Sequence, residues 1–399
     1  SSAASDVYKR QEVWKVQVPE DKRKQFEVLC TLMGREDVSY VVNGCDAGRE
    51  GELSVKRVYD LAKCRKPVKR LWISSMEDEA IQQGFQCLKD GDIYEGLCNA
   101  AVCRAQADWL IGMNATRAYT TRYFKRLVVG RVQTPTLAML IERKEKIDQF
   151  QKEAYYKVFL TDGKLTVTSE NIKSETEAEQ LRDDCDGEEA VITKVKKELK
   201  KNSPPKLYDL TSLQREANRF FGYTAQKTLD MLQELYEEKL VTYPRTDSQY
   251  VTEDMKGTME MLIDGMMGFL PFLQCVQPDR RIDLVTDNAK VSDHHAILPT
   301  KEALERGMEG LSEGKKNLLI LLGQQLIQAT GEDYCYEQTE ISVQCKKHEF
   351  TAKGKLPVQM GFKEVEEAFR NYCLKGKKED DMEKKSVLPT GYEKGMVLS

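Results

Sequence analysis

The chain has 399 residues, which is too long for one ordinary hydrophobic core, so we expect two or more domains. Its composition, 40% hydrophobic and 32% charged, is that of a globular protein, and no apolar run approaches the roughly twenty residues of a membrane span. The first residues show no signal-peptide pattern, so we expect a cytoplasmic protein. The 11 cysteines include no CxxC pair and there are only three histidines, which argues against zinc. The net charge of −4 leaves nucleic-acid binding undecided, because one basic channel can supply the phosphate contacts.

The first residues are unlike a protein start, because they lack an initiator Met. The stretch DVYKRQ at residues 6–11 is a translation of GAT GTG TAT AAG AGA CAG, which resembles a transposase adapter used in sequencing libraries. We therefore expect residues 1–11 to be a non-native leader. A disordered native tail is the alternative.

Residues 12–120 show an α/β pattern. Residues 40–42 are expected to form a buried strand that leads into an acidic turn, and residues 71–73 to form a second strand. Between them, apolar positions at helical spacing predict a helix that carries Val55, Val58, Tyr59 and Ala62. Strand, turn, helix and strand make a parallel unit, whose ligand site lies at the carboxyl ends of the strands.

The pattern then changes twice. Residues 97–147 are expected to be mostly helical, with interruptions at Gly130 and Pro135. Alternation typical of strands marks three later stretches: 156–160, 190–192 and 336–361. Charged linkers and a hinge-like SPP break at residues 203–205 separate them, and the charged tail after Gly376 is expected to be loose.

Two helices joined by a glycine turn follow the SPP break. Thr211 and Gln214 fit a capping box at the first helix, which ends at Gly222. This helix is expected to carry Leu213, Ala217 and Phe220. The second helix begins at Thr224 and is expected to bury Leu229, Leu232 and Tyr236. With a short strand at residues 240–243, the pair resembles a winged-helix element.

The most informative stretch is LVTYPRTDS at residues 240–248. Tyr243 ends the expected strand and Pro244 stops the ladder, which leaves the phenol at a rim. Positions i and i+2 of an extended segment face the same way, so Arg245 can share a target with Tyr243. A phenol has a pKa near 10 and needs help to attack phosphorus, and a guanidinium can grip the phosphate and stabilise its charge. By itself, the spacing favours the alternative of a Tyr-Pro turn with a solvated Arg245.

A second constellation is DAGREGE at residues 46–52. Asp46, Glu50 and Glu52 lie at a strand's end and a helix's start, where three carboxylates suit a divalent metal such as Mg²⁺. The alternative is an acidic helix N-terminus that complements the helix dipole. The sequence contains no GxxxxGK[ST] motif, so ATP-driven chemistry is not expected.

Two further segments can contact phosphates. Residues 130–136 (GRVQTPT) offer Arg131, Gln133 and Thr134 as donors before a helix, although an ordinary loop is the alternative. Residues 291–300 (VSDHHAILPT) contain His294, which can donate a hydrogen bond to a phosphate or move a proton. Adjacent histidines in a turn are otherwise surface or partly buried residues, and no metal site is expected there.

Together and in this order, these four segments resemble the type IA DNA topoisomerases, from about residue 12 to residue 361. Three further stretches match the family: residues 70–75 (RLWISS), 107–117 (ADWLIGMNATR) and 208–214 (YDLTSLQ). The YPRTDS form is similar to the topoisomerase III kind. The resemblance implies an enzyme that cuts a single DNA strand, passes another strand through the break and rejoins it without ATP.

The resemblance also implies roles for individual residues. Tyr243 would form a 5′-phosphotyrosyl link, Arg245 would stabilise that phosphate, and His294 would contact the DNA backbone. Asp46 and Glu50, with Glu52, would hold Mg²⁺. DNA-binding residues would be Arg131, Gln133, Thr134, Arg104, Arg117, Asp247 and Ser248. The expected partner is single-stranded or underwound duplex DNA, and the protein is expected to be monomeric and nucleoid-associated.

The implied fold is a multidomain α/β and α+β toroid. Residues 12–120 would form a partial Toprim domain and residues 206–334 a winged-helix-like domain with the tyrosine. Residues 152–205 and 335–360 would form a β-rich arch. Residues 121–151 and 361–399 would form part of a helical base domain that binds single strands.

The sequence departs from the family pattern in three ways. Gly48 stands where many members have a second Asp, but this form also resembles topoisomerase III-like proteins and is not interpreted as inactivation. We expect the first Toprim strand, with its Glu-Lys pair, to be missing ahead of Glu12, and the rest of the base domain to be missing after about Gly361. From these last two departures we expect an incomplete, weakly active fragment. The alternatives are a non-catalytic single-strand-binding remnant and a Toprim nuclease or primase-like enzyme. A covalent DNA adduct would distinguish a topoisomerase from the non-catalytic remnant, since only an enzyme can form one. The nuclease or primase-like alternative leaves Tyr243 without a role.

Overall fold

The computed structural model describes residues 16–73, 78–273, 280–291, 294–373, 388–389 and 391–398. The expected leader at residues 1–11 and most of the charged tail after Gly376 lie outside these residues, as do Ser292 and Asp293. The chain forms two compact units: Ser1–Gln151 with Val291–His294, and Lys152–Lys290 with His295–Ser399. Within the described residues, no helix combines the length and the apolar character needed to span a membrane.

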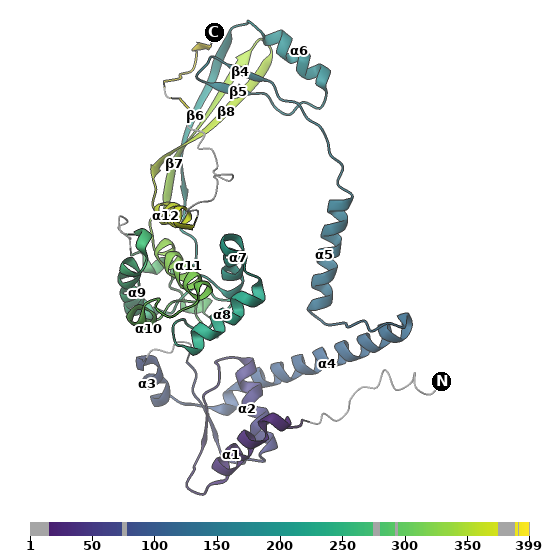
Figure 1. Cartoon of the computed structure of the whole chain (residues 1–399), viewed down its shortest axis with the longest axis vertical. Helices are drawn as coiled ribbons and strands as arrows, with labels where there is room; N and C mark the ends of the chain where they lie inside the picture. Colours follow the sequence, from purple (N-terminus) through teal and green to yellow (C-terminus); the bar gives the residue numbers. More distant parts are fainter. Residues whose placement is uncertain are drawn as a thin grey trace. The chain divides into compact units, whose positions relative to one another are not determined.

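The first unit contains a small sheet and a set of helices (Figure 1). Its strands are β1 (Val41–Asn43), β2 (Val68–Arg70) and β3 (Lys89–Asp90), in the order β1-β2-β3. Its helices are α1 (Arg23–Gly34), α2 (Arg49–Leu61), α3 (Asp78–Gln86), α4 (Glu95–Tyr123) and α5 (Gln133–Asp148), with 3-10 turns at Glu20–Lys22 and Gly91–Tyr94. β1 and β2 are parallel and are joined through α2, so the predicted parallel unit is confirmed.

The second strand of this unit lies three residues earlier than predicted. Val68 to Arg70 pair with β1, and the Leu71 amide still donates to the Asn43 carbonyl at 3.0 Å. Leu71 is buried, and the Trp72 ring stacks on Tyr94 with 4.6 Å between ring centroids. The apolar run therefore begins where the backbone pairing ends, and its side chains pack beyond the strand. Helices over residues 97–147 are confirmed as α4 and α5, although Pro135 lies in the first turn of α5 and does not interrupt it.

A buried arginine connects β1, β2 and α2. Arg70, 1% exposed, donates from Nε to Glu52 Oε1 at 2.5 Å. Its Nη1 donates to the carbonyls of Asn43, Cys45 and Leu71, and its Nη2 to the carbonyl of Asp46. The Asn43 amide donates to Glu52 Oε2 at 3.0 Å. A buried charge is tolerated only when it is paired and hydrogen-bonded, and this network meets that condition.

The second unit contains a six-stranded sheet in which every named pair of strands is antiparallel. The strands are β4 (Phe159–Thr161), β5 (Thr166–Thr168), β6 (Ala190–Asn202), β7 (Tyr334–Cys345), β8 (His348–Gln359) and β9 (Val397–Leu398), in the order β4-β5-β8-β7-β6-β9. The three stretches in which alternation predicted strands all overlap strands of the structure. The helix α6 (Glu175–Cys185) was not predicted; Ser174 caps its N-terminus.

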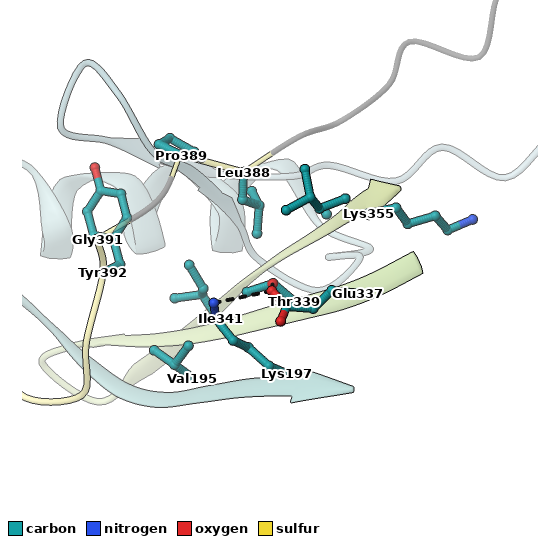
Figure 2. Close-up of a pocket in the computed structure, with 12 residues that line it drawn as sticks. Val195, Lys197, Glu337, Thr339, Ile341, Lys355, Leu388, Pro389, Gly391 and Tyr392 are labelled. Atoms are coloured by element: carbon teal, nitrogen blue, oxygen red, sulfur yellow. Dashed lines mark hydrogen bonds and ion pairs between the residues drawn. The ribbon is translucent and has the colours of Figure 1, made fainter. Parts of the chain in front are cut away.

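The last described residues pack on this sheet. β9 pairs with β6, and the Tyr392 hydroxyl donates to Asp162 Oδ2 at 2.8 Å. Figure 2 shows Leu388 and Tyr392 on one side of a cavity and Val195 and Ile341 on the other. The cavity holds about 60 Å³, far below the roughly 300 Å³ of the smallest ordinary ligand pockets, so this contact is packing rather than a binding site.

The rest of the second unit is helical and surrounds one buried helix (Figure 1). Its helices are α7 (Leu210–Phe221), α8 (Ala225–Glu237), α9 (Lys256–Phe269), α10 (Lys301–Arg306), α11 (Glu313–Ala329) and α12 (Lys363–Cys373). Short 3-10 turns lie at Glu253–Met255, Pro271–Leu273, Ile282–Val285 and Asn288–Lys290. α11 buries every residue from Leu318 to Ala329, so it is the centre of the core.

Three local predictions in this region need correction. The capping box uses Asp209 and Ser212 rather than Thr211 and Gln214, because the helix begins two residues earlier than the apolar pattern indicated. α8 buries Leu232 and Leu235, while Leu229 and Tyr236 are only half-buried. Residues 240–243 form an isolated bridge between Val241 and Pro299 instead of a strand. The helix ends at Gly222, with φ +69°, and at the Thr224 cap agree with prediction.

The described residues after Gly361 pack within the second unit. Val365 and Phe369 of α12 belong to its helical core, and β9 belongs to its sheet. Residues 121–151 group with the first unit. The base domain expected from residues 121–151 and 361–399 stays a prediction.

The Arg70 network predicts a large loss of stability on substitution. Arg70→Leu leaves the buried Glu52 carboxylate without its partner, and we expect a loss of ~3–5 kcal/mol in the free energy of unfolding of the first unit. The double variant Arg70→Leu with Glu52→Leu removes both charges and should recover part of that loss. Urea unfolding followed by tryptophan fluorescence reports this unit, because all three tryptophans lie within residues 1–151. A single variant within about 1 kcal/mol of the wild type would contradict the assignment.

Gly361 predicts a second, sharper stability effect. It has φ +50°, and a Cβ there would press on the backbone carbonyls of Glu332 and Asp333. Gly361→Ala should cost about 2–4 kcal/mol, since left-handed strain and overpacking add. The matched control is Gly163→Ala, at φ +87° with open space around it, which should cost only about 1 kcal/mol. Unfolding in urea is followed by far-UV circular dichroism. If both variants lowered the urea midpoint of unfolding by the same amount, the packing argument would be refuted.

Candidate active site

Tyr243 lies at the end of a short extended segment of the second unit. The Thr242 amide donates to the Leu298 carbonyl at 2.9 Å, and the Leu298 amide donates to Thr242 Oγ1 at 2.9 Å. The Thr300 amide donates to the Leu240 carbonyl at 3.1 Å, and the Thr300 hydroxyl to the Lys239 carbonyl at 2.6 Å. These bonds hold the backbone on both sides of Val241, although only one residue pair forms a bridge. The tyrosine is therefore positioned without a regular strand.

The phenol ring of Tyr243 is half-buried. It meets Tyr236 of α8 edge-on, with 5.4 Å between ring centroids and 79° between planes. Pro244 is buried, whereas Arg245 is exposed. One edge of the tyrosine thus rests on α8, and the guanidinium two residues later is available to solvent.

The rest of the YPRTDS segment has two kinds of residue. Thr246 and Ser248 are buried, and Ser248 Oγ donates to the carbonyl of Lys290 at 2.8 Å. Asp247 is exposed. Ser248 therefore anchors the loop after the tyrosine, and of the two residues expected to bind DNA here only Asp247 faces solvent.

The acidic turn belongs to the first unit and separates the three predicted carboxylates. The Asp46 and Glu50 side chains are 55% and 67% exposed, whereas Glu52 is buried with both oxygens occupied by Arg70 and Asn43. Gly51 lets α2 approach this turn, since a Cβ there would meet the Asp46 carbonyl. No group of three His, Cys, Asp or Glu side chains in the described part of the chain is placed to hold a metal ion.

His294, which groups with the first unit, lies beside the acidic turn. Its Nε2 is 3.9 Å from Asp46 Oδ2, and its side chain is mostly buried. The neighbouring His295 belongs to the second unit, where its Nδ1 is 2.7 Å from the Ala296 carbonyl. The two adjacent histidines therefore group with different units, and His294 has a carboxylate of the predicted set next to it.

A row of ion pairs follows α4 away from the acidic turn. Arg104 Nη1 lies 3.5 Å from Glu50 Oε1, and Arg104 Nε lies 4.0 Å from Asp108 Oδ2. Arg131 donates to Asp108 from Nε and, at 3.4 Å, from Nη2. This hydrogen bond lowers the pKa of Asp108 and raises that of Arg131. The structure thus brings together Glu50, Arg104 and Arg131, three of the residues predicted from the sequence.

The remaining predicted DNA contacts lie on exposed helix. Gln133 and Thr134 form the first turn of α5, and Thr134 Oγ1 accepts from the Gly130 amide at 3.0 Å. Arg117 is exposed on α4. Backbone amides at the start of a helix favour anions, so the Gly130 turn suits a phosphate.

Two residues that organise this region were not predicted. Arg70 was noted only as part of a matching stretch, and Asp108 likewise. Arg70 directly follows Lys69, and an arginine next to a lysine in a strand gives no signal that its side chain turns inward. The pairing of Asp108 with Arg131 spans 23 positions, which local patterns do not report.

Comparison with known proteins identifies what this arrangement is similar to. The DNA topoisomerase family model matches residues 92–396. The chain is 41% identical over 355 residues to DNA topoisomerase 3 of Bacillus subtilis, covering 86% of this chain and 48% of that protein. It is 41% identical over 389 residues to DNA topoisomerase 3 of Bacillus licheniformis, covering 94% and 52%. The chain therefore spans about half the length of these relatives.

A solved structure supports the same fold. Full-length topoisomerase I from Thermotoga maritima matches 96% of this chain and 61% of its own, with a TM-score of 0.70 and 23% sequence identity. The multidomain topoisomerase fold predicted from the motifs is thereby confirmed. Since the family model matches well over half of the residues, the chain belongs to the DNA topoisomerase family.

Proposed function

We propose that this chain catalyses ATP-independent cleavage and rejoining of single DNA strands through Tyr243, as a type IA DNA topoisomerase of the topoisomerase III kind. The observation that carries the proposal is the placement of Tyr243. It is half-buried and held by flanking hydrogen bonds, with an exposed arginine two residues later, inside the stretch that matches the family. A solvated Tyr-Pro turn needs no such support from residues 297–300.

The reaction conserves the energy of the broken linkage. The phenolic oxygen of Tyr243 forms a bond to phosphorus as the bond from phosphorus to the 3′ oxygen breaks. The phenol loses its proton and the departing 3′ oxygen gains one. A 5′-phosphotyrosyl link and a free 3′-hydroxyl result, and reversal of the same step reseals the strand without ATP.

Arg245 and His294 would act on the phosphate group. The exposed guanidinium of Arg245 can donate to phosphate oxygens and stabilise the charge of the pentavalent transition state. His294, whose Nε2 lies 3.9 Å from Asp46 Oδ2, can donate a hydrogen bond to the DNA backbone. Both side chains would act by hydrogen bonding and charge, and neither would form a covalent bond to the phosphate.

Asp46 and Glu50 fit a magnesium ion better than Glu52 does. Mg²⁺ keeps several waters and binds proteins through one or two carboxylates, which exposed side chains can supply. Glu52 is withdrawn from this set because both of its oxygens accept from protein donors. When bound, the ion would neutralise phosphate charge.

The substrate would be single-stranded or underwound duplex DNA. Arg104 lies on α4, Arg131 in the turn before α5, and Gln133 and Thr134 in the first turn of α5, where they can donate to phosphates. Arg117 and Asp247 remain proposed contacts, and Ser248 would act indirectly by anchoring the loop. We further propose a monomeric, nucleoid-associated cytoplasmic protein.

The proposal predicts a tyrosine-dependent covalent adduct of defined polarity. Wild-type protein with Mg²⁺ and single-stranded DNA, quenched with detergent, should retain a label at the 3′ end of the strand but not at the 5′ end. Tyr243→Phe should abolish the adduct because the nucleophile is removed. Its affinity for single strands should change less than about twofold, since it keeps the DNA contacts.

Tyr223→Phe serves as the matched control for this experiment. Its hydroxyl accepts from Asn317 in the same unit, and its loss should leave the adduct intact. An adduct that persists in Tyr243→Phe, or a wild-type chain that forms none, would overturn the proposed role of Tyr243 in this chain. Salt-sensitive binding without an adduct would instead favour the non-catalytic alternative.

The metal proposal predicts weaker binding of Mg²⁺ when the exposed carboxylates are neutralised. The double variant Asp46→Asn with Glu50→Gln should bind Mg²⁺ at least about tenfold more weakly, measured by isothermal titration calorimetry, because two charged ligands are lost. The control is Asp60→Asn, an exposed carboxylate on α2 that pairs with Lys56 at 2.9 Å. Unchanged affinity in the double variant would exclude these two residues as the ligands.

A further inference from the structure

The segment from the middle of α4 to the middle of α5 is strongly basic. Residues 109–141 contain no Asp or Glu, although the whole chain carries a net charge of −4. Five cations lie in this segment: Arg117, Arg122, Lys125, Arg126 and Arg131. A cationic stretch in an acidic protein concentrates the local attraction for phosphates.

Aromatic rings are exposed within the same segment. Tyr119 and Tyr123, one helical turn apart on α4, lie with ring planes 15° apart and centroids 6.0 Å apart. The two side chains are 50% and 60% exposed. The Arg122 guanidinium lies 5.8 Å from the Tyr123 ring centroid. The rings are thus parallel, solvent-facing and flanked by a cation.

Phe124 extends this group at the end of α4. It is 95% exposed and has φ +51°, a left-handed conformation that is costly for a bulky residue. Hydrophobic burial cannot explain an apolar ring in open solvent. Together with Tyr119, Tyr123 and Arg122, it forms what we call the aromatic cluster.

The loop after the cluster folds back along α4. The Leu127 amide donates to Thr120 Oγ1 at 3.2 Å, and the Val129 amide donates to Thr116 Oγ1 at 2.9 Å. This return places Arg131 next to Asp108. Helical spacing also places Tyr119 and Tyr123 on the α4 face that carries Asp108. The cluster is therefore continuous with the row of ion pairs described above.

We propose that the aromatic cluster is a stacking platform for the bases of single-stranded DNA, adjoining the phosphate contacts at Arg104 and Arg131. This inference rests on the proposed function and adds contacts to bases. Parallel exposed aromatic rings beside cations are the combination that binds single strands without sequence preference. A duplex buries the faces of its bases in its own stack, so the platform selects single strands.

The test compares binding of intact and abasic strands. A fluorescein-labelled thymine oligonucleotide and an abasic strand of equal length and charge are titrated with protein, and anisotropy gives the dissociation constants. Tyr119→Ala with Tyr123→Ala should weaken binding to the intact strand roughly 5- to 100-fold, the range of lost base stacking. The abasic strand should bind the variant and the wild type equally. Phe124→Ala should give a smaller loss of the same kind.

Matched variants separate stacking from charge. Phe85→Ala removes another exposed aromatic ring of the first unit and should leave both affinities unchanged. Arg122→Gln should reduce the salt dependence of binding for both strands, whereas the tyrosine variants should leave that dependence as it is. The removed rings are solvent-facing, so circular dichroism melting should be unaltered, which excludes a folding defect.

The outcomes distinguish this inference from the proposed function. Loss of affinity confined to the intact strand supports the platform. Equal binding by the tyrosine variants and the wild type, or equal losses on both strands, overturns it and points to a protein segment as the occupant of this face. Failure of the proposed function shows differently, as a missing 3′-labelled adduct in a wild-type chain that still binds single strands.

Discussion

The guanidinium of Arg70 donates to Glu52 and to the carbonyls of Asn43, Cys45 and Asp46, and this single buried group shapes the acidic turn. The Glu52 carboxylate is buried, and a buried charge is stable only when it is paired and hydrogen-bonded. Because Arg70 supplies that pairing and also binds the carbonyls of the turn, the predicted carboxylates have different surroundings. Glu52 is committed to the interior and Asp46 faces outward, where a metal or a phosphate can reach it.

The tyrosine is positioned by a different but related means. The hydroxyls of Thr242 and Thr300 form hydrogen bonds with backbone groups that would be paired within a regular strand. The irregular segment is therefore held in place much as a paired strand is. Behind it, α11 is buried along twelve residues and gives the second unit a rigid centre. Hydrogen bonds to the backbone near the site thus orient the Tyr243 segment, while the packed core holds that segment in position.

The sequence predicted what is local and periodic. The caps at Gly222 and Thr224 depend on the backbone preferences of one or two residues, so they could be read directly. The strand at β2 was misplaced because the apolar residues 71–73 pack sideways, and α6 was missed because it is charged on most of its surface. The engagement of Glu52 depends on Arg70, eighteen positions away, and no local pattern distinguishes a buried carboxylate from an exposed metal ligand.

In the structure, two of the arginines proposed to contact phosphates are paired with carboxylates along α4. Arg104 and Arg131 already hold the carboxylates of Glu50 and Asp108, and these pairs are solvent-exposed. Exposed pairs are weak and screened by salt, so a phosphate that replaces a carboxylate meets little resistance. Such an exchange at Arg104 also releases Glu50, one of the two carboxylates suited to Mg²⁺. Binding of the strand and loading of the metal would therefore favour each other, because both draw on the same guanidinium–carboxylate pair.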